Sequence, residues 1–431
     1  MASADWVAAG GFLVLFVMLA LRVPVGVAMG LVGVFGFAAI RGLDPALNLL
    51  ASSPIRVIAD FNLSLIPFFI LMGVFATNSG MSRELFRAGN AWFGRFRGGL
   101  ALSTIAACAG FSAICGSSVA TAATMTKIAL PEMRRFGYRE DVASGVVAAG
   151  GTLGILIPPS VVLVVYAYIT EQDVGRLFIA GIVPGLLAVL MYMATVRIAH
   201  SRGLPDGRPF ELGEALRAMS GVWAVLVLFI AIIGAIYLGV ATPTEAAAVG
   251  ALLTMLIGIV RRRLGPRLIV ESLTEALRTS VAIYTILIGA ILFGYFLAIT
   301  QTPQKITAFL IALDIGAHGT LALILVLFVA AGCILDAMAM VILLVPIVFP
   351  VILDLGFDPI WFGVIIVMTV ELGLITPPVG MNVFVINSIA RDVSLPTIFR
   401  GVLPFIATDI VRLVLLVLFP AIVLFLPGTM K

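Results

Sequence analysis

The stretch GGTLGILIPPS, residues 150–160, decides the fold of this chain. It lies in an apolar run long enough to cross a bilayer, yet it contains three glycines and the adjacent prolines Pro158 and Pro159. The segment ELGLITPPVG, residues 371–380, repeats the pattern. Because proline has no backbone N–H and its ring clashes with the preceding turn, each Pro-Pro pair ends a half-helix and frees carbonyls there. The sequence therefore predicts two broken helices.

The composition indicates where these helices lie. Apolar residues make up 62% of the chain, charged residues 11%, and the mean hydropathy is +1.20. A soluble domain has roughly 45–50% apolar residues. The apolar stretches have the length of about 17–25 residues that a helix needs to span a bilayer, and they lack the alternation of barrel strands. We therefore predict an all-α integral membrane protein in a lipid bilayer.

Two apolar stretches, 99–130 and 318–350, are interrupted at their centres by SAICGSSVAT and GCILDAM. Small residues and hydroxyls allow the backbone to turn at membrane depth where it is buried in protein or lines a cavity. We expect both stretches to be re-entrant helical hairpins that enter and leave by the same face. The other apolar runs predict spans near 6–21, 24–40, 63–80, 141–170, 177–196, 221–241, 243–260, 279–300, 359–390 and 401–427.

The basic residues flank particular span ends, in clusters at 83–97, 134–139, 197–217 and 261–278. With the two hairpins as described, these clusters fall on one face, which the positive-inside rule makes cytoplasmic, with both termini outside. The net charge of +4 is thus explained by topology and not by binding to nucleic acid. The chain contains no P-loop pattern, so we do not expect it to hydrolyse ATP itself.

One constant offset relates the two halves of the chain. The shift of 219 that takes Pro158 to Pro377 also superposes Pro131, Gly137 and Gly154 on Pro350, Gly356 and Gly373. An odd number of spans separates the hairpins, so the second repeat is predicted to be inverted. Inverted repeats with broken helices are typical of secondary transporters. The expected domains are 1–98 (scaffold and arm helices), 99–175 (first transport repeat), 176–317 (scaffold helices and second arm), 318–392 (second transport repeat) and 393–431 (C-terminal helix).

The broken helices suggest a chemistry. Free carbonyls at the C-terminus of a half-helix suit a cation, and the adjacent helix N-termini and hydroxyls suit an anion such as a carboxylate. We expect a Na⁺ or H⁺ pocket in each repeat with the substrate between them. The alternative is that the prolines only kink buried helices.

Several segments carry a family resemblance: SLIPFFILMG (64–73), GSSVAT (116–121), the block 137–160, TPTEAAAVGA (242–251), LDAMAMVILLVPIVFP (335–350) and ELGLITPPVG (371–380). Over about residues 20–425 the chain resembles the large membrane subunit of tripartite ATP-independent periplasmic (TRAP) transporters. The resemblance implies an elevator-type symporter of the bacterial inner membrane that imports an organic acid with Na⁺ as coupling ion. It also implies two partners, a separate small membrane subunit of about four helices and a periplasmic substrate-binding protein. It implies no cofactor.

The resemblance also implies site residues. The first Na⁺ site would lie between the first hairpin tip and the first break, and the second would lie between the second hairpin and the second break. Substrate would bind near polar residues on the facing helices. The first-site residues are Ser112, Cys115, Gly116, Ser117, Gly154, Ile157 and Pro159; the second-site residues are Gly332, Gly373, Thr376 and Val379; the substrate-side residues are Ser118, Thr121, Asp336 and Asn382.

Other readings stay open at this stage. Asp336 and Glu371 lie at membrane depth, where ionisable residues are usually functional, but each could instead cap or pair locally. Glu245 follows Thr242 at a helix start and is expected to complete a capping box. A stand-alone carrier of similar architecture would need neither partner subunit. An intramembrane enzyme is disfavoured, because the chain has no HExxH or paired intramembrane aspartate motif.

Overall fold

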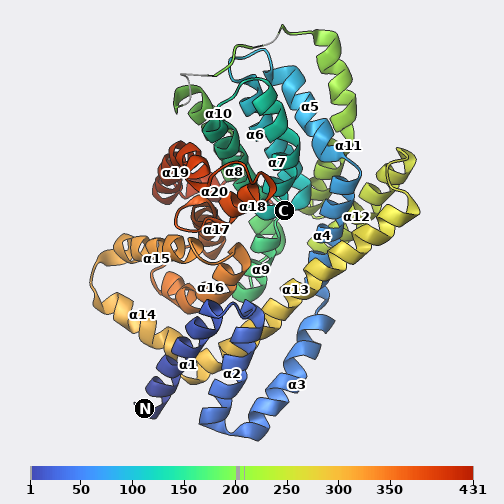
Figure 1. The fold of residues 1–431 in the computed structure, drawn as a ribbon. Coiled ribbons are helices and arrows are strands. Elements are labelled where there is room, and N and C mark those ends of the chain that lie inside the picture. Colours follow the sequence, from blue (N-terminus) through green and yellow to red (C-terminus); the bar gives the residue numbers. More distant parts are fainter. Residues whose placement is uncertain (1, 200–203, 208, 431) are drawn as a thin grey trace.

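The computed structural model describes residues 2–199, 204–207 and 209–430, and every regular element within these ranges is a helix (Figure 1). Seven of the described helices are long and apolar enough to cross a membrane, or eight if one bent pair counts as a single span. The prediction of an all-helical membrane protein is confirmed.

The N-terminal helices cluster around one long helix. α13, which crosses Figure 1 diagonally, packs against α2 and α4 and also reaches α16. α12 lies between α4 and α11 and starts with the predicted capping box, because Thr242 and Glu245 each accept a hydrogen bond from the other's backbone N–H. The bounds are α1 Ala2–Ala20, α2 Val25–Arg41, α3 Leu43–Ala59, η1 Phe61–Ser64, α4 Leu65–Asn78, α5 Met81–Phe93, α11 Leu212–Tyr237, α12 Pro243–Val260, α13 Pro266–Ile299 and α14 Thr302–Ala312.

The remaining helices form two hairpins and two interrupted helices. α6 and α7 make the first hairpin and α15 and α16 the second, while α8–α9 and α17–α18 are separated by the two Pro-Pro segments. α8 and α17 pack against each other, and α10 and α19 pack beside both of them. The bounds are α6 Gly99–Cys115, α7 Ser118–Arg135, α8 Glu140–Leu156, α9 Val161–Thr170, α10 Val174–Ala199, α15 Gly316–Gly332, α16 Ala337–Asp354, α17 Pro359–Ile375, α18 Met381–Ile389, α19 Leu395–Leu418, α20 Ala421–Leu424 and η2 Pro427–Thr429.

The offset of 219 recurs in the helix bounds. Shifted by 219 residues, the limits of α7 coincide with those of α16, and the limits of α8 coincide with those of α17. α10 and α19 end at equivalent positions, Ala199 and Leu418. Three pairs of helices in the two halves therefore have corresponding limits under this shift.

The hydropathy reading missed three helices. α3 lies where a connection was expected after residue 40, α5 lies in the basic stretch before the first hairpin, and α14 lies before the second hairpin. α5 buries Met81, Leu85 and Phe86 and exposes Arg83 and Arg87, so its mean hydropathy hides its apolar face. α13 also begins at Pro266, well before the predicted span at 279.

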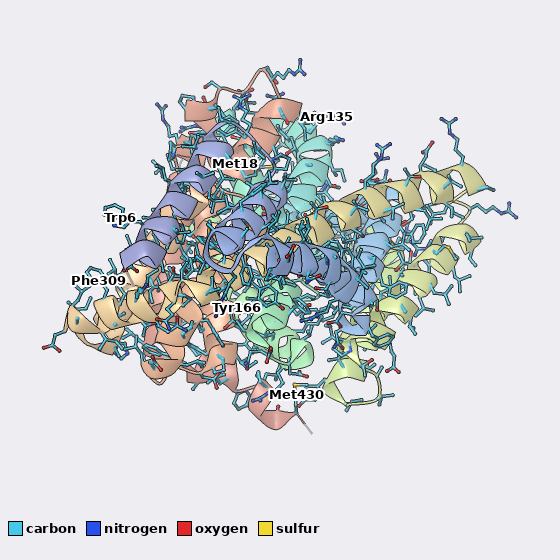
Figure 2. All side chains as sticks on the ribbon, turned by 90° about the horizontal axis from the view of Figure 1, so that it is seen from below. Trp6, Met18, Arg135, Tyr166, Phe309 and Met430 are labelled. Atoms are coloured by element: carbon cyan, nitrogen blue, oxygen red, sulfur yellow. The ribbon has the colours of Figure 1, made fainter. Side chains whose placement is uncertain are left out.

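An ion pair connects the N-terminal turns of α1 and α14. Asp5 of α1 forms an ion pair with Lys305 of α14. Figure 2 shows Trp6 and Phe309 projecting from these two helices, with 79% and 64% of their surface exposed, whereas Tyr166 is fully buried. An exposed tryptophan such as Trp6 suits a membrane–water interface.

Candidate ion and substrate sites

The first hairpin tip packs into the first helix break. α6 ends in a left-handed residue, Gly116, with φ of +63°. A Cβ atom at Gly116 would lie 2.6 Å from the Pro159 carbonyl oxygen, and a Cβ at Gly154 would lie 2.5 Å from the Ser117 carbonyl oxygen. Only glycine permits backbone to approach backbone this closely. The structure therefore brings the tip residues Gly116 and Ser117 against Gly154 and Pro159.

The first break removes helical donors from its carbonyls. α8 ends at Leu156, α9 begins at Val161, and the two are bent by 40°. In a continuous helix the carbonyls of Gly154 and Ile155 would accept from residues 158 and 159, which are both proline. The Ser160 hydroxyl donates to the Ile155 carbonyl over 2.5 Å. The Gly154 carbonyl therefore lacks its i+4 helical donor at the point where Gly154 packs against the hairpin tip.

The other first-site residues lie at the ends of the same segments. Ile157 is the residue that caps α8, and Cys115 is the buried last residue of α6. The Ser112 hydroxyl donates to the Cys108 carbonyl of its own helix over 2.7 Å, and the Ser117 hydroxyl accepts from the Ala120 N–H. Both hydroxyls therefore form local hydrogen bonds at the ends of α6 and α7 in this structure.

The second break meets the second hairpin through a pair of glycines. A Cβ added to Gly373 would lie 2.7 Å from the Gly332 Cα atom. Thr376 caps α17, and its hydroxyl donates to the Leu372 carbonyl over 2.5 Å, which leaves its lone pairs available. Val379 follows the prolines and is half-buried. The predicted second-site residues therefore lie either at the Gly332–Gly373 contact or in the Pro-Pro segment that follows α17, where Thr376 and Val379 stand.

The two breaks differ in exposure. Pro158 and Pro159 are buried, whereas Pro377 and Pro378 are exposed. Both Pro-Pro peptide bonds are cis. Two segments of related sequence thus stand in different environments.

Two substrate-side candidates contact each other across the repeats. The Asn382 side chain on α18 donates to the Ser118 hydroxyl at the start of α7 over 2.7 Å, and both residues are buried. Thr121 lies one turn further along α7 and donates to the Ser117 carbonyl. Asp336 instead caps α16, accepting from two backbone N–H groups over 2.9 and 3.1 Å. Its local capping role was one of the two readings left open above.

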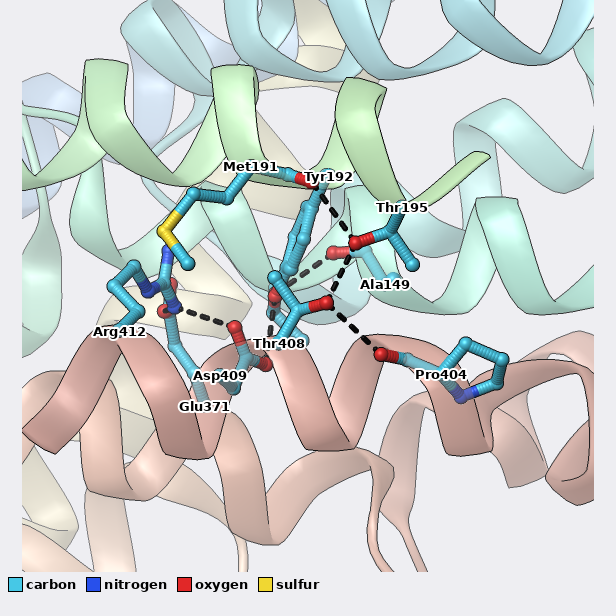
Figure 3. A network of polar contacts seen from close by, with 10 residues as sticks. Ala149, Met191, Tyr192, Thr195, Glu371, Pro404, Thr408, Asp409 and Arg412 are labelled. Carbon is cyan, nitrogen blue, oxygen red and sulfur yellow. Dashed lines mark hydrogen bonds and ion pairs between the residues drawn. The ribbon is translucent and has the colours of Figure 1, made fainter. Parts of the chain in front are cut away.

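A charged cluster beside the second break was not predicted as a unit (Figure 3). Arg412 of α19 donates to Glu371 of α17 over 3.0 Å and lies 2.9 Å from Asp409. The hydroxyl of Tyr192 on α10 donates to Asp409 over 2.8 Å and lies 3.1 Å from the hydroxyl of Thr152 on α8. The side chains of Glu371 and Arg412 have no exposed surface.

Part of this charged cluster could be recognised in the sequence. Glu371 was singled out as an intramembrane carboxylate, and Asp409 and Arg412 stand three residues apart in an apolar helix, a spacing that allows a pair on one helix face. Their contact with Glu371, and the part played by Tyr192, depend on packing between distant segments.

Comparison with known proteins identifies the family. The family model described as "Tripartite ATP-independent periplasmic transporter, DctM component" matches residues 12–422. The chain belongs to this family.

Curated TRAP relatives agree with this assignment. The C4-dicarboxylate TRAP transporter large permease protein DctM of Pseudomonas aeruginosa is 39% identical over 400 residues, which cover 90% of this chain and 93% of the relative. The isethionate TRAP transporter permease protein DctMQ of Oleidesulfovibrio alaskensis is 35% identical over 97% of this chain and 66% of the longer relative. Both are named as permeases, which places this chain among transport proteins and not among enzymes.

A solved structure shares the fold. The YdaH transporter of Alcanivorax borkumensis is 16% identical and superposes with a TM-score of 0.66, covering 88% of this chain and 90% of the YdaH chain. At this identity the likeness shows the fold alone.

The TRAP chain also has a cavity that is separate from the helix breaks. Its volume is about 840 Å³, and polar side chains from α3, α9 and α13 line it, among them Arg56, Tyr168 and Tyr295. Arg56 donates to the Tyr295 hydroxyl over 3.1 Å. None of the predicted ion or substrate residues lines this cavity.

Proposed function

We propose that this chain is the permease subunit of a Na⁺-coupled secondary transporter that imports an organic acid across the bacterial inner membrane. The observation that carries the proposal is the seating of each hairpin against a helix break, where the proline pair removes the i+4 backbone donors of the last helical carbonyls. Unwound carbonyls at half-helix ends are typical ligands of Na⁺ in secondary transporters. The substrate anion would lie between the two breaks, near Ser118, Thr121 and Asn382.

The transport cycle we propose is an elevator movement. The two hairpins and the helices packed with them would move as one body relative to the scaffold around α4, α11, α12 and α13. The repeat would then be inverted, with the first hairpin entering from the cytoplasm and the second from outside. The matching helix bounds of the two halves support a repeat, and the topology labelling described in the Discussion tests its inversion.

We further propose that the transporter needs two partners, a separate four-helix membrane subunit and a periplasmic binding protein. The longer relative whose name joins M and Q supports a second membrane component, because this chain covers only 66% of it. The binding protein would select the acid, so the permease alone does not define the substrate. The named C4-dicarboxylate and isethionate relatives both handle small organic anions.

Reconstitution tests the proposal. The periplasmic binding protein proposed above is first screened by thermal shift against a panel of organic acids. Uptake of the radiolabelled acid that it binds is then measured in proteoliposomes containing both membrane subunits and the binding protein. We expect uptake only with an inward Na⁺ gradient and all three components. Rapid uptake by this chain alone would instead favour a stand-alone carrier.

A further inference from the structure

The charged cluster of Figure 3 is built from four helices that pack together, namely the two half-helices α8 and α17 and the neighbouring α10 and α19. Thr152 precedes Gly154 by two residues on α8, and Glu371 precedes Gly373 by two residues on α17. Tyr192 comes from α10, and Arg412 comes from α19. The cluster therefore reaches the last turn of both half-helices whose carbonyls form the proposed ion sites.

The contacts run without interruption from one break to the other. Glu371 accepts from Arg412 over 3.0 Å, and Arg412 pairs with Asp409 at 2.9 Å. Asp409 accepts from the Tyr192 hydroxyl over 2.8 Å. The Thr152 hydroxyl donates to the Ala149 carbonyl of its own helix over 2.7 Å and lies 3.1 Å from the Tyr192 hydroxyl, so the last link is a close polar contact that joins Tyr192 to α8.

The burial of this chain of contacts makes its geometry stiff. Tyr192, Glu371 and Arg412 have no exposed surface, and Asp409 has 2%. Polar groups in such surroundings lose far more when a partner moves away than they would in water. Arg412 also lies over the Tyr192 ring, with its guanidinium carbon 5.4 Å from the ring centroid. A displacement at one end would therefore be transmitted rather than absorbed by solvent.

We propose that Glu371, Arg412, Asp409, Tyr192 and Thr152 form a positioning unit that couples the two Na⁺ sites of the proposed function. Ion binding to the carbonyls after Gly373 fixes the end of α17, and the contacts pass this constraint to the end of α8. Occupancy of one site then raises the affinity of the other. None of the five side chains needs to touch an ion. This inference rests on the Na⁺ coupling proposed above.

The test separates coupling from folding by cutting the contacts at single oxygens. Tyr192→Phe removes the hydroxyl that links Asp409 to Thr152. Thr152→Val removes the hydroxyl on α8 and leaves the Tyr192 hydroxyl free to donate to Asp409. Thr195→Val is the matched control, because the Thr195 hydroxyl also joins α10 to α19, through Thr408 at 2.5 Å, but lies outside the unit. Each variant is reconstituted with both partners, and uptake is measured against Na⁺ concentration.

We expect the wild type and Thr195→Val to show sigmoidal Na⁺ activation with a Hill coefficient above one. Tyr192→Phe and Thr152→Val should approach a coefficient of one, with half-saturation raised about fivefold or more, the lower range of allosteric coupling. The melting temperature of each purified complex reports folding, and Thr152→Val decides the question if Tyr192→Phe does not assemble.

Three results would overturn the inference. Sigmoidal activation that persists in Thr152→Val would show that the contacts do not couple the sites. Hyperbolic activation in the wild type would show that there is no coupling to explain. Wild-type uptake that does not depend on Na⁺ would refute the proposed Na⁺ coupling itself. The first two results would refute only the coupling between the sites and would leave the proposed function standing.

Discussion

The substitution Gly154→Ala tests the seating of the first hairpin tip. The added Cβ would lie 2.5 Å from the Ser117 carbonyl oxygen, which belongs to the backbone and cannot rotate away. Ordinary contact begins near 3.4 Å, so the tip or the end of α8 must shift by about 0.9 Å. Such overpacking typically costs about 1–3 kcal/mol, offset by about 1 kcal/mol because alanine favours a helix over glycine.

The expected loss of stability is therefore small, about 0–2 kcal/mol, whereas the expected loss of transport is large. A displacement of about 1 Å in a positioned site can reduce a rate by about 10²-fold. We expect Gly154→Ala to assemble with its partners and to lose most Na⁺-driven uptake in proteoliposomes. The measurements are the initial uptake rate at saturating substrate over a range of Na⁺ concentrations and the melting temperature of the complex.

Gly234→Ala is the matched control, because it lies within α11 and nothing stands within 4 Å of an added Cβ. It should transport as the wild type does and melt at the same temperature or slightly higher. Normal Na⁺ activation in Gly154→Ala would refute the reasoning, since the tip could then move without consequence and the first ion site would lie elsewhere.

Three further predictions concern the second site and the topology. Thr376→Val removes one oxygen at the second break, which should cost roughly 1–3 kcal/mol of Na⁺ binding and raise the Na⁺ concentration for half-maximal uptake by about one to two decades. The control Thr369→Val, within α17, should have no effect. Pro377→Ala restores a backbone N–H that can extend α17 into the break, so coupled uptake should be abolished, and unchanged uptake would mean that the proline only bends the helix. A cysteine at exposed Gly265 should react with an impermeant reagent only from the cytoplasm and one at exposed Gln304 only from outside, and labelling of both from one side would remove the inverted repeat.

The helix breaks were predictable because their cause is local. A proline pair lacks two backbone donors wherever it lies, so the ends of α8 and α17 follow from the sequence itself. The corresponding limits of α7 and α16 and of α8 and α17 were predictable for a related reason, because prolines and glycines constrain the backbone and recur at the same spacing in both halves. The capping box at the start of α12 also depends on neighbouring residues alone.

Features that depend on the surroundings were not predictable. α5 escaped a reading by mean hydropathy because only one of its faces is apolar. The hydrogen bond between Ser118 and Asn382 joins residues 264 positions apart, and the bond between Tyr192 and Asp409 joins residues 217 positions apart. No local pattern signals such partners. Asp336 depends on neighbouring residues instead, since its two capping bonds to Met338 and Ala339 could be expected from the start of a helix.

Helices with corresponding limits in the two halves carry different side chains. Under the offset of 219, Thr152 is equivalent to Glu371, and each stands two residues before the glycine of its break. One position carries a hydroxyl and the other a carboxylate, yet both belong to the same buried cluster because α8 and α17 pack together. The exposure of the breaks differs as well, being low at Pro158-Pro159 and high at Pro377-Pro378. Corresponding positions of α8 and α17 therefore differ in charge, and the two breaks that follow them differ in access to solvent.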